Sequence, residues 1–140
     1  MNKDVKLTIS GLHTDAEEEH ASVETVVEAQ YFKRGDSHYL LYEEMQEGFD
    51  KPSQNRMKFR ENLLELNRKG LMETHMVFEE GKTHMTNYAT PYGQMVLGIQ
   101  TKRIWVQELE NRILVNVEYR LEADGEYLED SRITLRIEEK

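Results

Sequence analysis

Apolar and polar residues alternate with a period of two along most of the chain. Val5, Leu7 and Ile9 are apolar, whereas Lys6 and Thr8 between them are polar. Because successive side chains of a strand point to opposite faces, this spacing predicts strands with one buried face. The segments that qualify take up nearly the whole chain: 5–9, 23–31, 39–45, 57–59, 63–68, 74–79, 83–89, 95–107, 115–121 and 132–137.

Short polar turns, most of which contain glycine, separate these segments. Connections of this length join antiparallel neighbours. The turn at Glu80-Gly81 is expected to form a hairpin in which Phe78 pairs with Thr83. The chain therefore reads as a succession of hairpins.

The last hairpin, around Asp124-Gly125, admits two loop lengths. A two-residue loop would place apolar and charged residues on the same face of the hairpin. A three-residue loop, residues 123–125, with a bulge at Gly125, pairs Val115 with Ile133 and gives one continuous apolar face. We therefore favour the three-residue loop.

The longest predicted strand changes its phase in the middle. Apolar residues occupy odd positions from Met95 to Ile99, but Ile104 and Val106 occupy even positions. This change predicts a β-bulge near Lys102 or Arg103, which would bend the strand and sharpen its twist.

Consecutive hairpins and a bent long strand favour an all-β fold, an antiparallel up-and-down barrel of about 8–10 strands, because an open sheet of that size would expose its edges. A two-sheet sandwich is the alternative. Only residues 14–21 resemble a helix, with Thr14 as N-cap and Glu17 as its capping-box partner. Residues 46–54 are expected to form a loop that covers one barrel mouth. Residues 1–140 are expected to form a single domain.

Composition narrows the classes of function. With 38% hydrophobic and 32% charged residues in 140, and no long apolar run, we expect a soluble protein that does not span a membrane. The amino terminus lacks the apolar stretch of an export signal, so a cytoplasmic location is expected. The formal net charge of -9 argues against nucleic acid and anionic membranes as partners.

No motif points to catalysis, to a metal or to a cofactor. The chain has no cysteine, and its five histidines match no ligand spacing. It contains neither a Gly-x-Ser-x-Gly elbow nor a glycine-rich phosphate loop. We assign no catalytic residue and predict no metal or cofactor, although paired carboxylates among 27 acidic residues leave an enzymatic activity open.

Polar residues on faces that should be buried are the best candidates for a binding site. Arg68 continues the parity of the apolar residues before it, and in the favoured hairpin register Tyr119 lies opposite Glu129. Trp105 shares the parity of Arg103 and would either cap the barrel lumen or fill its core. Because buried charges must be paired or solvated, Arg68, Tyr119 and Glu129 either satisfy one another in a packed core or line a ligand cavity. Together with Arg103 and Trp105 they are the candidate ligand-binding residues.

A local basic stripe lies within this acidic chain. Arg56, Lys58 and Arg60 alternate along one strand face, opposite Met57 and Phe59, and the next strand adds Arg68 and Lys69. The stripe is either a solvated face that protects the strand or a docking surface for an acidic peptide or a small anion.

Residues 79–101, EEGKTHMTNYATPYGQMVLGIQT, together with the segment YRLEADG that begins at Tyr119, resemble the YwiB-like family of small bacterial proteins. The most specific part is Thr90-Pro91-Tyr92-Gly93 between two strands, and the similarity extends over nearly the whole chain. The resemblance implies a calycin-type, lipocalin-like barrel from the cytoplasm of Gram-positive bacteria. It implies no activity and no catalytic residues.

Two functional hypotheses follow from the sequence. The first is a non-enzymatic cytoplasmic barrel that binds a small amphiphilic or anionic ligand in its lumen. The alternative is a solid barrel that acts as a protein-interaction module or forms a homodimer.

Overall fold

The structure, a computed structural model, describes residues 3–11, 24–45, 51–70, 73–90 and 93–140. In this part of the chain the secondary structure consists of ten strands and no helix. The strands are β1 (Asp4–Ser10), β2 (Glu24–Arg34), β3 (Ser37–Glu44), β4 (Ser53–Arg60), β5 (Leu63–Lys69), β6 (Thr74–Glu79), β7 (Thr83–Thr90), β8 (Gly93–Glu108), β9 (Arg112–Ala123) and β10 (Glu126–Glu139).

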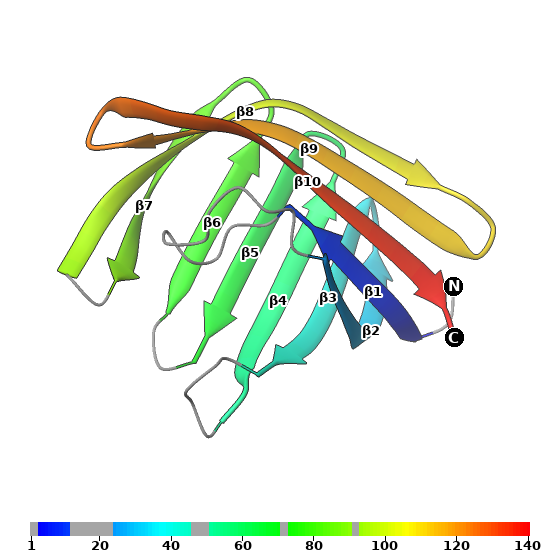
Figure 1. The fold of residues 1–140 in the computed structure, drawn as a ribbon. Helices are drawn as coiled ribbons and strands as arrows, with labels where there is room; N and C mark the ends of the chain where they lie inside the picture. The colour runs from blue at the N-terminus through cyan, green and yellow to red at the C-terminus, as the bar shows by residue number, and fades with distance from the viewer. Residues whose placement is uncertain (1–2, 12–23, 46–50, 71–72, 91–92) are drawn as a thin grey trace.

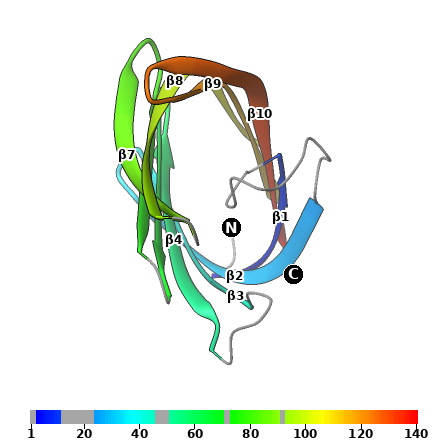
Figure 2. The same cartoon turned by 60° about the vertical axis from the view of Figure 1, so that its left-hand side comes forward.

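The ten strands form one antiparallel sheet that curls into a nearly closed barrel (Figures 1 and 2). Their order is β6-β5-β4-β3-β2-β1-β10-β9-β8-β7, so each strand pairs with its sequence neighbour except between β6 and β7. The first and last strands pair with each other, with Leu7 opposite Ile137. The predicted all-β antiparallel barrel is confirmed, whereas its lipocalin-like character stays a prediction.

The expected pairing of Phe78 with Thr83 is wrong, because no ladder joins the described strands β6 and β7. The turn between them bonds to β8 instead. The Gly81 amide donates to the Thr101 carbonyl at 2.9 Å, and the Thr101 amide donates to Lys82 at 3.1 Å. These bonds hold the turn against β8, and the sheet ends on β6 and β7. Side chains bridge these two strands in place of a ladder, since the Thr86 hydroxyl donates to the His75 carbonyl at 2.5 Å.

The bulge predicted in the longest strand is confirmed. The pairing of β8 with β9 shifts between Thr101 and Arg103, so that Lys102 is the extra residue. Ile99 before the bulge and Ile104 after it are both buried, although they differ in parity. The bulge therefore keeps the apolar side of a 16-residue strand on the interior.

The three-residue loop favoured for the last hairpin is wrong. Ala123 pairs with Glu126, and Asp124 and Gly125 have φ values of 52° and 82°, as a two-residue type I′ turn requires. The mixing of faces is avoided by a second bulge, between Tyr127 and Glu129 in β10. Beyond that bulge Val117, and not Val115, lies opposite Ile133.

The middle of the barrel is filled by side chains. The largest fully buried ones are Tyr119, Phe59, Phe78, Leu7, Leu40, Met57, Leu64, Leu66, Met76, Ile99, Ile133 and Leu135. The rings of Phe78 and Tyr119 meet across the interior edge to face, with centroids 5.0 Å apart. A side chain that lined a water-sized void would keep some exposed surface, so the interior around these residues is solid.

Two sequence predictions fall outside the described residues. The helix predicted for residues 14–21 lies there entirely, and so do residues 46–50 of the predicted mouth loop. The end of that loop segment, Ser53 and Gln54, belongs to β4.

Candidate ligand-binding site

Polar side chains gather at both ends of β3, on the face that points into the barrel. His38 lies at the start of this strand and Glu44 at its end, while Leu40 and Tyr42 between them are buried. Each end is the centre of a group of polar residues. We call Tyr42, Glu44, Asn55 and Arg68 the Arg68 cluster, and Tyr31, Lys33, His38 and Glu108 the His38 cluster.

Strand register brings the Arg68 cluster together. Tyr42 of β3 lies opposite Asn55 of β4, and Asn55 lies opposite Arg68 of β5. All three continue an apolar row on the same face, which holds Leu40, Met57 and Leu66. The period of two therefore carries three polar side chains inward at one end of the barrel.

Arg68 is the buried cation of this cluster, with only 6% of its surface exposed. Its Nη2 lies 3.2 Å from Oε2 of Glu44, and Nδ2 of Asn55 donates to the same oxygen at 3.5 Å. The side chain of Glu44 is 25% exposed. The carboxylate is thus the more exposed partner of this ion pair.

Three buried polar atoms of the Arg68 cluster have no hydrogen-bond partner among the described residues: Nε of Arg68, Oδ1 of Asn55 and the hydroxyl of Tyr42. An unsatisfied buried polar atom costs about 1–3 kcal/mol. Burial raises the pKa of Tyr42 and the nearby Glu44 carboxylate adds to this rise, while Arg68 opposes it. The hydroxyl therefore keeps its proton, and two unused donors stand beside one unused acceptor.

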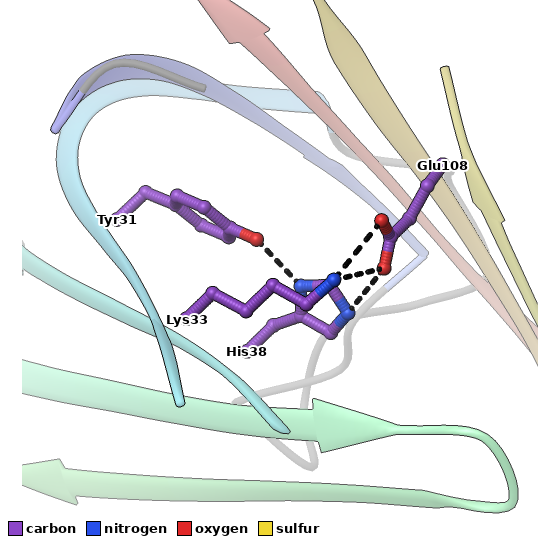
Figure 3. A network of polar contacts seen from close by, with 4 residues as sticks. All are labelled: Tyr31, Lys33, His38 and Glu108. Atoms are coloured by element: carbon purple, nitrogen blue, oxygen red, sulfur yellow. Dashed lines mark hydrogen bonds and ion pairs between the residues drawn. The ribbon is translucent and has the colours of Figure 1, made fainter. Parts of the chain in front are cut away.

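The His38 cluster links the two sides of the barrel at the other end of β3. Figure 3 shows Glu108, at the end of β8, reaching side chains of β2 and β3. Its Oε1 lies 2.9 Å from Nε2 of His38 and 3.2 Å from Nζ of Lys33. The Tyr31 hydroxyl lies 2.6 Å from Nδ1 of His38, whose ring stacks on Phe59 with centroids 4.7 Å apart.

The contacts of His38 define its protonation state. A carboxylate only accepts hydrogen bonds, so Nε2 of His38 donates to Glu108, and Nδ1 accepts from the Tyr31 hydroxyl. Burial lowers the pKa of His38 more than the adjacent Glu108 raises it. Burial together with Glu108 raises the pKa of Tyr31 to about 12. Both groups are therefore neutral at pH 7.

Acidification is expected to destabilise the protein through His38. Because the folded-state pKa of His38 lies below the unfolded value of about 6.5, the unfolded chain binds the proton more readily. This contribution to stability is complete above about pH 6.5 and is lost as the pH falls through the folded-state value. Urea unfolding at pH 7.5 and 5.5 should show a larger loss for the wild type than for His38→Gln. Equal losses in the wild type, His38→Gln and the exposed control His75→Gln would contradict the assignment.

A hollow of about 420 Å³ lies beside the His38 cluster and opens to solvent. Lys33 and Arg60 line it together with Asp36, Glu61 and Glu108. Cations and anions are mixed there, and the polar atoms of His38 are already satisfied. The Arg68 cluster, with its unused polar atoms, is the stronger candidate.

The five residues proposed from the sequence occupy different places. Arg68 is at the centre of the buried cluster. Tyr119 is buried in the middle of the barrel, where its hydroxyl donates to the Gly11 carbonyl at 3.4 Å. It lies opposite Ser131, so the expected pairing with Glu129 is wrong. Glu129 is half-buried and pairs with Leu121.

Arg103 and Trp105 lie on the outer surface of β8. The guanidinium carbon of Arg103 is 4.3 Å from the centroid of the Trp105 ring, which is the arrangement of a cation–π contact. Trp105 is 36% exposed, whereas its neighbour Ile104 is buried. Trp105 therefore neither caps the lumen nor fills the core, because the bulge at Lys102 turns the even positions of β8 inward.

The part of the basic stripe on β4 faces outward, as its parity predicts, and Lys69 of β5 is exposed, but Arg68 of β5 faces inward. Arg56 and Arg60 are exposed and Lys58 is half-buried, with Nζ of Lys58 5.8 Å from the ring centroid of Tyr39. Docking of a peptide or an anion on this stripe stays a prediction.

Within the described ranges, no group of three or more His, Cys, Asp or Glu residues is placed to hold a metal ion. The same part of the chain contains no helix with the length and apolar character needed to cross a bilayer.

Comparison with known proteins identifies the family and the fold. A family model described as "Domain of unknown function (DUF1934)" matches residues 7–135. A crystal structure of the ywiB protein from Bacillus subtilis superposes with a TM-score of 0.74 and 16% sequence identity, covering 98% of this chain and 90% of that one. At this identity the likeness shows the fold alone. No curated protein matches the chain.

Proposed function

The chain belongs to the DUF1934 family, which is the YwiB-like family that it resembles, and we propose that it is a non-enzymatic cytoplasmic barrel that binds a small ligand at the Arg68 cluster. Fold and family name leave the activity open, so the proposal stands on the site itself.

One observation carries the proposal: three polar atoms of Tyr42, Asn55 and Arg68, none with a partner in the described part of the chain, lie together on the inner face of adjacent strands. Together they cost several kcal/mol if nothing binds them, since each contributes about 1–3 kcal/mol. A ligand that supplies acceptors to Arg68 and Tyr42 would recover most of this energy, and a ligand that also carries a donor for Asn55 would recover the rest. Such a gain supports specific recognition of a polar group.

Packing in the middle of the barrel limits the size of this ligand. Met57 and Leu66, which lie next to the cluster on the same face, are 1% exposed. A long tail would have to displace these side chains, and displacing packed core residues costs about 1–3 kcal/mol per site. We therefore expect the ligand to be small and to stay at the end of the barrel.

The solid middle also fits the alternative, a barrel that acts as an interaction module or a homodimer. Large apolar side chains such as Met85 and Tyr127 are exposed on the outside, at 61% and 58%. Scattered exposed apolar residues are ordinary on protein surfaces, however. Several unsatisfied polar atoms in one buried cluster are rare in native proteins, and they favour the ligand-binding hypothesis over the alternative.

Native mass spectrometry of the protein purified from its natural host tests this function. We expect the wild type to carry an additional small mass, and Arg68→Met to lose it because the buried cation is gone while its apolar volume is kept. Arg56→Met, which removes an exposed arginine from β4, is the matched control and should keep the mass.

If Arg68→Met retains the small mass, the ligand does not bind at the Arg68 cluster, and the proposed site is wrong. A wild-type spectrum of bare protein in dimeric form would favour the alternative instead.

A further inference from the structure

The Arg68 cluster is closed by a side chain of the protein that is itself a carboxylate. Glu44 lies on Nη2 of Arg68 at 3.2 Å and is the most exposed member of the cluster. Arg68, Asn55 and Tyr42 are all at least nine-tenths buried. Glu44 is therefore the member of the cluster that is most accessible to a molecule from solvent.

The contact between Glu44 and Arg68 uses only part of the guanidinium. A planar carboxylate can bind arginine through Nε and Nη2 at once, in two parallel hydrogen bonds. Here Nη2 has an oxygen, while Nε is buried without a partner among the described residues. Glu44 thus pairs with Arg68 through Nη2 but leaves the Nε–H group without an acceptor.

Charge restricts what can take the place of Glu44. Without Glu44, Arg68 would be a buried cation with no anionic partner among the described residues, and breaking a buried ion pair in this way is strongly destabilising. A neutral group would leave that cost in place, whereas an anion would restore the pair. The replacement must therefore be negatively charged.

We infer that Glu44 occupies the position of a ligand carboxylate, and that binding proceeds by exchange of the Glu44 carboxylate for that of a small carboxylic acid. The ligand binds Nε and Nη2 of Arg68 and accepts from the Tyr42 hydroxyl, while Glu44 turns into the solvent. Glu44 is then an internal competitor that sets the affinity of the site. This inference rests on the proposed function, whose site it specifies.

Removing the competitor should tighten binding. We expect Glu44→Gln to bind sodium propanoate about tenfold more tightly than the wild type, because the ligand no longer displaces a charged rival. Propanamide, which has the same shape and no charge, should bind neither protein. Glu43→Gln removes the same charge from an exposed neighbour that bonds Gln54, and it should leave the affinity unchanged. Titrations are followed by NMR at constant ionic strength.

A second measurement uses the wild type alone and does not depend on how a variant folds. The Nε–H signal of Arg68 should move downfield on addition of propanoate, because the unpaired donor gains an acceptor. Propanamide should leave this signal in place.

The outcomes separate the inference from the function. Equal affinity of the wild type and Glu44→Gln, equal binding of propanamide, or tighter binding of inorganic phosphate would overturn the exchange of carboxylates and leave a ligand site intact. Absence of propanoate binding in every variant would also overturn it. The proposed function would then be tested only by native mass spectrometry, that is, by whether the wild type carries a small mass that Arg68→Met loses.

Discussion

Truncation of Phe78 to alanine is expected to lower the free energy of unfolding by about 3–5 kcal/mol, the range for a fully buried aromatic residue. Phe78 is 0% exposed and lies in β6, at one end of the sheet. Its ring contacts Tyr119 of β9, so it joins strands that no ladder connects. The loss would combine a cavity in the core with a broken aromatic contact.

Urea unfolding measures this loss, and Val77→Ala is the matched control. Val77 precedes Phe78 in the same strand and is only half-buried, so its truncation should cost about 1 kcal/mol or less. Equal losses for the two variants would mean that the middle of the barrel is not solid.

Replacement of Gly11 by alanine is expected to cost about 3 kcal/mol, from backbone strain of about 1–2 kcal/mol and overpacking of about 1–3 kcal/mol. Gly11 follows β1 and has a φ of 79°. A β-carbon at this position would overlap the carbonyl oxygen of Arg132 in β10 and lie 3.1 Å from its carbonyl carbon. Because both partners are backbone, relief requires the pairing of β1 with β10 to shift.

Gly125→Ala provides the comparison for Gly11→Ala. Gly125 has nearly the same φ, 82°, but nothing lies within 4 Å of a β-carbon placed on it. This variant should lose only the strain of about 1–2 kcal/mol. If Gly11→Ala unfolds at the same urea concentration as Gly125→Ala, the close approach of residues 11 and 132 adds no cost beyond backbone strain, which would contradict this prediction.

Alternation of apolar residues was enough to predict the strands, because one face of each strand must be buried. The bulge at Lys102 could also be predicted, since apolar residues before and after it differ in parity. The second bulge, between Tyr127 and Glu129, left no such sign. Tyr127 and Leu128 are both large and both exposed, so the pattern around the slip does not mark an interior face.

The Arg68 and His38 clusters were predicted only in part. Arg68 stood out as a charge on an apolar face, and Asn55 and Glu44 carry the same signal, because both follow the interior parity of their strands. His38 is likewise on the interior parity of β3. Its partner Glu108, at the end of β8, comes 70 residues later in the chain, and a local sequence pattern cannot predict a contact between such distant residues.

A crystal structure of the wild-type protein grown in sodium propanoate would show whether a ligand carboxylate replaces that of Glu44 on Arg68. We expect a carboxylate within hydrogen-bonding distance of Nε and Nη2 of Arg68, with the side chain of Glu44 turned outward. Glu44 still on Arg68, with propanoate bound elsewhere or not at all, would contradict it.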